Sequence, residues 1–512
     1  MTAMNRAWKW VVLLAVLTAP WLRGLSFPFL YDDLGMIAEN SFLEDPANLA
    51  PVLAGRTLAD PHVVNGRRPA VLATYFFDRA VYGLLPAGWR LTNLLLHLGC
   101  VALWMLLLRR LGGRHFLVAA AGLLFGLHPV LVEAVHAPGF RADVLCLLFI
   151  LLALHGFLGA GRYAVLARLG GAVCLALALL SKETALAAPL ALGGLVVLYP
   201  GAFAGGRSAR WAWLAAAMGM ATAFFALWAW LPAELQTAGR AWNGESLQFP
   251  QTVYSAPALW TRTLRLLLVP WPLNVAPAFA PVSSVSSPRF WAGVFWLAAC
   301  GWGAWRARRA APAVTLGLLW MLAFFLPVAN VLPLLHSVAD RYLYPLAPGF
   351  ALVASWLLAQ QSRRGRALGL GMLAAVYALL LTLRLSQWAS AETLWTAAYF
   401  QNPRSATAAT WLGLLRAEAG DADGARAFYR AAVEANPQAG KAWCNWGVLE
   451  GQTGNLVESE RLLRQAVAVR PEGAEGWHNL AVCLEKQGRK TESAAAAARA
   501  AELADPYGRV KP

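Results

Sequence analysis

Long apolar stretches recur through the first three quarters of this 512-residue chain, and they restrict its fold more than any other feature. Many of them approach or exceed about 18 residues, the length at which an α-helix can cross a bilayer. Hydrophobic residues make up 59% of the sequence and charged residues 14%. A soluble protein has about 25% charged residues. The sequence therefore predicts an all-α, polytopic membrane protein.

Short arginine clusters separate the apolar stretches. The formal charge of +16 would suit a nucleic-acid-binding protein. We exclude that class because the clusters lie where the positive-inside rule expects cytoplasmic loops. Arg6 and Lys9 predict a cytoplasmic N-terminus, and alternation from there gives about eleven spans. The spans are expected at residues 8–26, 91–108, 116–131, 143–160, 163–180, 185–200, 211–231, 289–305, 312–331, 343–360 and 367–385.

Two long segments between spans are expected on the outer face. The first is the loop 27–90. The second, 232–288, is rich in Pro, Ser and Asn, and its stretch from Leu259 to Val269 predicts a re-entrant or interfacial helix. An odd number of spans also places the C-terminal region outside. We therefore expect a membrane domain at 1–386 and an extracytoplasmic domain at 387–512.

A period of 34 residues begins in the C-terminal region. It relates Gly420 to Gly454 and Gly488, Pro403 to Pro437 and Pro471, and Trp443 to Trp477. This period is typical of tetratricopeptide repeats, each a helix–turn–helix unit, and predicts an α-solenoid with repeats at 404–437, 438–471 and 472–505. The glycines are expected at the turns within the repeats. Either the repeats form an inert cap or dimerisation surface, or their concave groove binds an extended peptide.

The six cysteines show neither a CxxC motif nor a Cys/His spacing typical of metal ligands. We therefore predict no structural zinc. Four cysteines lie in apolar stretches, and Cys444 and Cys483 lie in the repeats. We expect free thiols at these two positions rather than a disulfide.

Ionisable residues gather at the predicted outer ends of the spans. Such residues are costly near a membrane unless they are paired or functional. Asp32 and Asp33 follow the first apolar stretch directly, and the others are Arg68, His128, Glu133, His136, Arg141, Asp143, Lys182, Glu183 and Arg341. Carboxylates can take a proton from a hydroxyl, and basic side chains can stabilise a departing phosphate. The pattern indicates transfer from a lipid phosphate to a hydroxyl group.

The motifs around these residues resemble those of the transmembrane and tetratricopeptide-repeat-containing (TMTC) O-mannosyltransferases and their bacterial relatives, in the GT-C class of glycosyltransferases. They are Phe29-Leu30-Tyr31-Asp32-Asp33, Arg68-Pro69, Leu127-His128-Pro129-Val130 with Glu133-Ala134-Val135, Gly139-Phe140-Arg141-Ala142-Asp143, Ser181-Lys182-Glu183-Thr184 and Asp340-Arg341-Tyr342-Leu343-Tyr344. The resemblance follows nearly the whole chain in order and ends in the same repeats.

The resemblance implies a GT-C fold and a single sugar, mannose or a similar hexose, carried by a polyprenyl phosphate. The acceptors would be Ser or Thr hydroxyls of extracytoplasmic proteins bound by the repeats. By role, Asp32, Asp33 and Glu133 would be catalytic, Arg68, Arg141, Lys182 and Arg341 would bind the donor phosphate, and His128, His136, Asp143 and Glu183 would orient the sugar or acceptor. Which aspartate is the base stays open.

No cofactor or metal is expected, because a monophosphate donor needs a cation less than a pyrophosphate does. The acidic pair is still a candidate for a divalent cation. The bias toward Ala, Leu, Gly and Arg, with compact loops, indicates a multi-pass protein of the bacterial inner membrane with its repeats in the periplasm.

Other interpretations stay open. The protein can instead be an oligosaccharide ligase, a lipid or glycan glycosyltransferase, or a non-enzymatic membrane anchor that presents its repeats. At single positions, Asp32 and Asp33 can cap the next helix, since Asp is a favoured N-cap. His128 can form the turn before a proline, and Lys182 and Glu183 can form a local ion pair.

Overall fold

The computed structural model of the protein describes residues 4–60, 63–230, 249–331, 334 and 336–504. Within these ranges helices are the only regular secondary structure, which confirms the predicted all-α class. The helices of the membrane part are α1 (Met4–Leu22), α4 (Pro86–Arg110), α5 (His115–Gly126), α7 (Arg141–Phe157), α8 (Ala164–Leu179), α9 (Ala188–Leu198), α10 (Gly206–Trp230), α12 (Gln251–Leu268), α13 (Pro288–Ala307), α14 (Pro312–Phe325), α15 (Ala347–Ala359) and α16 (Arg363–Gln387).

Each of the eleven expected spans overlaps one of these helices, and α12 is an additional helix. Four helices of the described chain are long and apolar enough to cross a membrane: Pro86–Arg110, Pro138–Phe157, Gly206–Ala229 and Arg363–Gln387. They become five if the bent pair His115–Gly126 and Pro129–His136 is one span. The chain is thus a multi-pass membrane protein, and the number eleven stays a prediction.

Helix α12 covers the stretch for which a re-entrant or interfacial helix is predicted. Its first residue, Gln251, lines the same cavity as residues 275–281, which follow the helix. Whether this helix is re-entrant or interfacial stays a prediction. Residues 231–248 of the expected outer segment lie outside the described residues.

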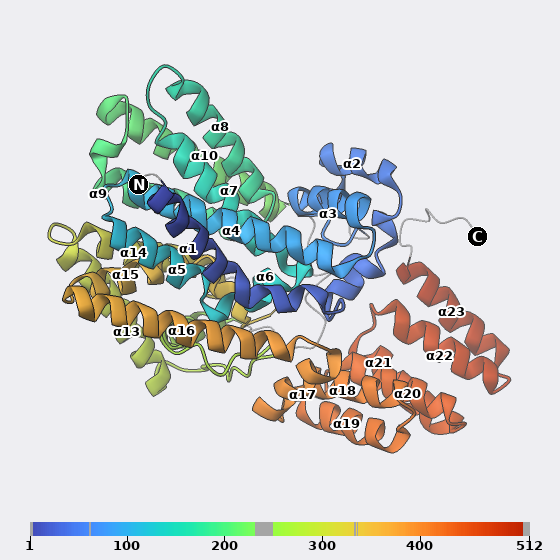
Figure 1. Cartoon of the computed structure of the whole chain (residues 1–512). Coiled ribbons are helices and arrows are strands. Elements are labelled where there is room, and N and C mark those ends of the chain that lie inside the picture. The colour runs from blue at the N-terminus through green and yellow to red at the C-terminus, as the bar shows by residue number, and fades with distance from the viewer. Residues whose placement is uncertain (1–3, 61–62, 231–248, 332–333, 335, 505–512) are drawn as a thin grey trace.

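Short helices connect the long ones. They are η1 (Arg23–Ser26), η2 (Leu34–Ala38), η3 (Ser41–Leu43), η4 (Pro46–Asn48), α2 (Leu49–Leu53), η5 (Arg56–Ala59), α3 (Pro69–Tyr82), η6 (Pro129–Leu131), α6 (Val132–His136), η7 (Pro138–Phe140), η8 (Glu183–Ala187), η9 (Pro200–Ala202), η10 (Leu326–Val328) and η11 (Asp340–Leu343). In Figure 1, α2 and α3 lie at the same end of the helical bundle as the repeats.

Several arginine-rich turns meet at the other end of α16. Arg114, Ala310 and Arg366, from three different turns, line one cavity of about 350 Å³. Arg110 donates to the carbonyls of His155 (3.1 Å) and Leu158, joining a fourth turn to them. These turns lie near the start of α16, whereas its last residue leads into the repeats (Figure 1). At 1.5 Å per residue, the 25 residues of α16 separate the two ends by about 37 Å.

The described part of the C-terminal region, residues 387–504, contains seven helices after α16. They are α17 (Ala391–Gln401), α18 (Ala406–Glu418), α19 (Ala422–Ala435), α20 (Gly440–Gln452), α21 (Leu456–Val469), α22 (Ala474–Lys486) and α23 (Lys490–Ala504). The last six form three pairs, at residues 406–435, 440–469 and 474–504, within the ranges expected for the repeats; residue 505 lies outside the described residues. Gly420, Gly454 and Gly488 have φ angles of 80°, 90° and 78°. Their expected place at the turns is confirmed, and glycine adopts such angles without steric cost.

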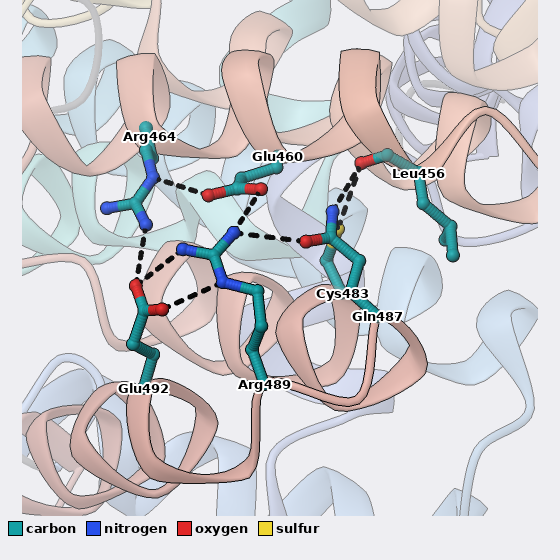
Figure 2. A network of polar contacts seen from close by, with 7 residues as sticks. All are labelled: Leu456, Glu460, Arg464, Cys483, Gln487, Arg489 and Glu492. Carbon is teal, nitrogen blue, oxygen red and sulfur yellow. Dashed lines mark hydrogen bonds and ion pairs between the residues drawn. The ribbon is translucent and has the colours of Figure 1, made fainter.

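The repeats pack through small residues and polar contacts. A Cβ atom on Gly413 of α18 would lie 2.6 Å from the ring of Tyr429 on α19, so only glycine allows this approach. Figure 2 shows the polar network between the second and third repeats, in which Arg489 bridges Glu460 and Glu492. The Gln487 amide donates to the Leu456 carbonyl at 2.9 Å (Figure 2). All six cysteines are free thiols, as expected for the two in the repeats.

Candidate active site

The acidic pair lies in a tight turn that follows η1. The N–H of Asp33 donates to the Leu30 carbonyl (3.0 Å) and that of Leu34 to the Tyr31 carbonyl (3.2 Å). Tyr31 has a φ of 55°, a left-handed conformation that costs a non-glycine residue roughly 1–2 kcal/mol. Its ring packs edge-on against Phe140, and against Trp395 and Trp411 of α17 and α18. The repeats therefore help to hold the turn that carries both aspartates.

The two oxygens of Asp33 are engaged within the protein. Oδ1 accepts the N–H of Gly139 at 2.7 Å, and Oδ2 accepts that of Leu30 at 3.4 Å. Arg90 Nη2 lies 3.9 Å from Oδ2 and donates to the Pro28 carbonyl at 2.5 Å. Asp33 is 1% exposed. Its carboxyl group thus ties the loop after the first helix to the turn at Gly139.

Asp32 differs from its neighbour. It is half-buried, and its carboxylate makes no hydrogen bond to any described residue. Burial raises the pKa of Asp32, while the positive charges of Arg341 and of Lys441 on α20 pull that pKa down. Of the pair, Asp32 is therefore the carboxylate with oxygens available to a substrate.

Three ion pairs lie in this part of the structure, and the guanidinium of one of them, Arg341 with Glu133, acts on the Asp32 carboxyl group. Arg341 bonds Oε1 of Glu133, whose Oε2 has no hydrogen-bond partner within the described ranges. Lys182 lies 2.6 Å from Asp143, and both side chains are at most 5% exposed. The third pair, Arg68 with Glu183 at 3.3 Å, is about one-third exposed.

Tyr342 lies between two of these pairs. Lys182 Nζ is 5.3 Å, and the Arg341 guanidinium carbon 5.4 Å, from the centre of its ring. The structure thus brings together seven of the expected site residues: Asp32, Arg68, Glu133, Asp143, Lys182, Glu183 and Arg341. Such a cluster of cations and carboxylates can bind an anion and accept a proton.

Arg141 lies apart from this cluster. Its guanidinium pairs with Asp78 and bonds Asn93 Oδ1 (2.6 Å) and the Trp89 carbonyl (3.2 Å), and Arg141 and Asp78 are 0% exposed. The rings of Tyr75 and Trp89 lie 5.1 and 5.6 Å from its charge centre. The expected contact with a donor phosphate does not fit these surroundings, because the charge is already matched and sealed from solvent.

The two histidines are also used within the protein. His128 is 0% exposed; its Nε2 lies 3.0 Å from the Leu267 carbonyl and its Nδ1 accepts the N–H of Val130. It therefore forms the turn before Pro129, the alternative left open by the sequence. The ring of His136 packs between Phe27 and Trp388 and is 4% exposed. An orienting role toward substrate does not follow from either geometry.

Several residues next to the cluster were not among the site residues expected from the sequence. Tyr342 stands within the Asp340-Arg341-Tyr342 motif, which was its only signal. Asp340 pairs with Arg262 of α12 at 2.8 Å and accepts the N–H of Asn274 at 2.8 Å. Arg90 and Lys441 had no signal, because their partners are distant in sequence.

The acidic pair was also a candidate for a divalent cation. Among the described residues, no group of three or more His, Cys, Asp or Glu side chains is placed to hold a metal ion.

Asp33→Asn is expected to change how stability depends on pH. Burial raises the pKa of Asp33 from 3.8 to about 7, against the opposing effects of Arg90 and the N–H groups of Gly139 and Leu30. Between these values the folded protein binds more protons than the unfolded chain, so the contribution of Asp33 to stability falls as pH rises. Asparagine resembles the neutral acid and lacks this titration.

Thermal unfolding in detergent from about pH 4 to about pH 7 measures this effect. The wild type should lose stability relative to the Asp33→Asn variant as pH rises, whereas Glu39→Gln, at an exposed position of the same loop, should follow the wild type. A difference between wild type and Asp33→Asn that is constant with pH would contradict the assignment.

With the geometry established, comparison with known proteins gives matches to a family model and to curated relatives. A family model described as tetratricopeptide repeat matches residues 380–440 and 444–508. Protein O-mannosyl-transferase Tmtc1 of Drosophila melanogaster is 34% identical over 191 residues, which cover 35% of this chain and 22% of that protein. Protein O-mannosyl-transferase TMTC2 of Mus musculus is 32% identical over 140 residues, which cover 27% of this chain and 17% of that protein.

Among solved structures, ArnT from Cupriavidus metallidurans bound to undecaprenyl phosphate aligns with 91% of this chain and 80% of its own, at 19% identity and a TM-score of 0.41. The matched segments span about a fifth of the length of the curated relatives. The chain therefore has TMTC protein O-mannosyl-transferases as sequence homologues and carries tetratricopeptide repeats at its C-terminal end.

Proposed function

We propose that the protein is a membrane glycosyltransferase of the GT-C type. It moves a single sugar, mannose or a similar hexose, from a polyprenyl phosphate to Ser or Thr hydroxyls of extracytoplasmic proteins. The observation that carries the proposal is Asp32, a half-buried carboxylate without a hydrogen bond to the described residues and beside the cation of Arg341. The similarity to O-mannosyl-transferases supports the same reaction class.

In this reaction Asp32 accepts the proton of the acceptor hydroxyl as the hydroxyl oxygen bonds to the anomeric carbon. The bond between that carbon and the phosphate oxygen breaks, and the phosphate leaves with the bonding electrons. The transition state resembles an oxocarbenium ion, as in glycoside hydrolysis. A carboxylate base contributes typically about 10²–10⁴-fold to such a step. A raised pKa suits the base, because it increases its affinity for the proton near neutral pH.

The cations of the cluster bind the donor phosphate in this proposal. Arg68 is the accessible one, since about a third of its side chain is exposed. Lys182 and Arg341 are held by Asp143 and Glu133, so their charges are fixed in place before the phosphate arrives. Fixed charges of this kind stabilise developing negative charge without having to reorganise during the reaction.

The carboxylates of the cluster orient the sugar and the acceptor. Oε2 of Glu133 is buried and lacks a hydrogen-bond partner among the described residues. A substrate hydroxyl that reached it would supply the missing donor. Asp143 and Glu183 act mainly through the cations that they hold. Arg141, His128 and His136 support the packing around the site.

An apolar cavity gives the donor lipid a place. It measures about 590 Å³ and lies between α9, α12, α13 and α14, with Leu190, Pro257, Leu297 and Phe325 among its lining residues. Leu190 follows η8, the short helix that begins with Glu183. A donor whose lipid chain occupied this cavity would therefore have its phosphate next to Arg68 and Lys182.

The proposed location is the bacterial inner membrane, with a cytoplasmic N-terminus and periplasmic repeats. The arginine-rich turns meet near the start of α16, while Asp32 and the repeats lie near its other end. By the positive-inside rule the arginine-rich end is cytoplasmic. The site would then face the compartment in which secreted proteins are found.

The proposal is tested with purified protein and a radiolabelled polyprenyl-phosphate mannose. Arg68→Gln is expected to raise the KM for the donor about tenfold to a hundredfold, since hydrogen bonds to charged groups are worth about 1.5–3 kcal/mol. Stability should change little, because the pair with Glu183 is partly exposed.

Arg79→Gln is the matched control. Arg79 lies on α3, the helix that begins directly after Arg68, and also pairs with a glutamate, Glu44, at 3.6 Å. Arg79 lies outside the cluster, so the donor KM of the Arg79→Gln variant should stay near that of the wild type. Equal donor KM values for the two variants would remove Arg68 from the phosphate site. A wild-type protein that transfers no label to Ser or Thr of any offered protein or peptide would refute the proposed activity.

A further inference from the structure

A cavity of about 790 Å³ lies between the membrane part and the first repeat. Tyr31, Arg341 and residues 275–281 line it from the membrane part, and Arg404 and Ala435 line it from the repeats. Its volume is within the range of about 300–1,000 Å³ typical of ligand sites. Since neither part forms the cavity alone, anything bound there contacts both.

One wall of the cavity is the segment of residues 275–281, which forms neither helix nor strand. The Asn274 amide donates to the Ala398 carbonyl at 3.1 Å, and the N–H of Val282 donates to Ser255 Oγ at 2.9 Å, so the segment is fixed at both ends. Between these anchors, the N–H groups of Ala278 and Phe279 have no hydrogen-bond partner among the described residues. An extended peptide can pair with free backbone groups of this kind, as in β-strand addition.

The charged side chains that line the cavity are cationic. Arg404 is exposed and has no ion-pair partner within the described ranges, and Arg341 is paired with Glu133 outside the cavity lining. Burial and the charge of Arg341 lower the pKa of His336, which also lines the cavity, to about 3, so this ring is neutral near pH 7. A positively charged cleft attracts a ligand with negative charges.

The inner part of the cavity adjoins the proposed base. Tyr31 precedes Asp32 in the tight turn, and the charge of Arg341 acts on the Asp32 carboxyl group. A hydroxyl on a chain that lies along residues 277–281 would therefore come from the repeat side toward Asp32.

We propose that this cavity binds the acceptor as an extended polypeptide segment with acidic residues near its Ser or Thr. The inference rests on the proposed function for the fate of the hydroxyl, but not for the binding itself. The repeats thus supply one wall of the acceptor site in addition to any binding on their concave face. Arg404 selects the charge of the segment.

The first test is peptide binding by the full chain in detergent or nanodiscs, without donor. A fluorescent peptide of alternating Thr and Asp serves as the probe. Ala435→Trp fills the cavity from the last residue of α19 and should weaken binding about tenfold or more, which corresponds to at least about 1.4 kcal/mol. Ala435 is exposed, so the larger side chain does not disturb the packing of the repeat.

Ala427→Trp is the matched control, because Ala427 is exposed on the same helix and does not line the cavity. It should bind the peptide within about twofold of the wild type. Equal affinities of the Ala435→Trp, Ala427→Trp and wild-type proteins would overturn the proposal.

The second test is charge selection. The wild type should prefer the Thr–Asp peptide to a Thr–Lys peptide of the same length, and Arg404→Glu should reverse that order. An unchanged order would refute the role of Arg404. Because binding is measured without donor, a protein that transfers no sugar can still satisfy both tests. Conversely, normal sugar transfer with peptide binding unaffected by Ala435→Trp would reject this site alone.

Discussion

Asp32→Asn is expected to lower the rate of sugar transfer by about 10²–10⁴-fold, the usual contribution of a general base. The asparagine amide has nearly the same shape but cannot take the proton of the acceptor hydroxyl. Because the Asp32 carboxylate makes no hydrogen bond to a described residue, the substitution breaks no contact of the fold. The melting temperature should therefore stay within experimental error of the wild type. Single-turnover transfer from radiolabelled donor measures the chemical step.

Asp33→Asn provides the internal comparison. Its amide oxygen can still accept the N–H of Gly139, and we expect a loss of at most about tenfold in transfer rate. Glu39→Gln, an exposed acid of the same loop, controls for a general change of charge. A transfer rate that falls more in Asp33→Asn than in Asp32→Asn would reverse the assignment of the base. Full activity in both variants would remove the pair from the mechanism.

Arg141→Met is expected to destabilise the protein by about 3–5 kcal/mol, the usual result of removing one partner from a buried ion pair. Asp78 would then carry a buried charge without its partner, because both side chains are 0% exposed. The contacts with Asn93 and the Trp89 carbonyl would also be lost. Chemical denaturation in detergent, without donor or acceptor, measures the free energy of unfolding.

The double variant Arg141→Met with Asp78→Leu separates a structural role from a phosphate-binding one. Replacing both partners of a buried pair with apolar groups is often neutral for stability. The double variant should thus recover much of the loss caused by Arg141→Met. A single variant that unfolds like the wild type but has a raised donor KM would show instead that Arg141 binds phosphate.

Local signals in the sequence were sufficient for the helices and the repeats. The length of each apolar stretch, such as 91–108, predicts a helix because a chain in lipid must satisfy its backbone hydrogen bonds internally. Gly420, Gly454 and Gly488 could be assigned to turns because their spacing repeats and glycine tolerates positive φ. The sequence also predicted a helix where α12 lies, but α12 begins earlier than expected, at Gln251.

Site residues were harder to sort. Asp32 and Asp33 are identical and adjacent, and nothing local distinguishes them. Their difference comes from Gly139, about a hundred residues away, whose N–H reaches Asp33 and not Asp32. Arg141 looked like a phosphate ligand because it stands among site motifs, and only packing reveals Asp78 as its partner.

The sequence by itself determined an all-α membrane protein with repeats, and a set of charged residues at the ends of its helices. Periodicity, hydrophobicity and turn residues act over a few positions, and each is readable from neighbours in the chain. Tertiary structure alone decided which charged side chains pair with one another and which are left to bind a substrate. It also decided that Tyr31, Arg341, Arg404 and Ala435 share one cavity. Ion pairs and cavities join distant segments, and their energies depend on burial, which only the folded chain defines.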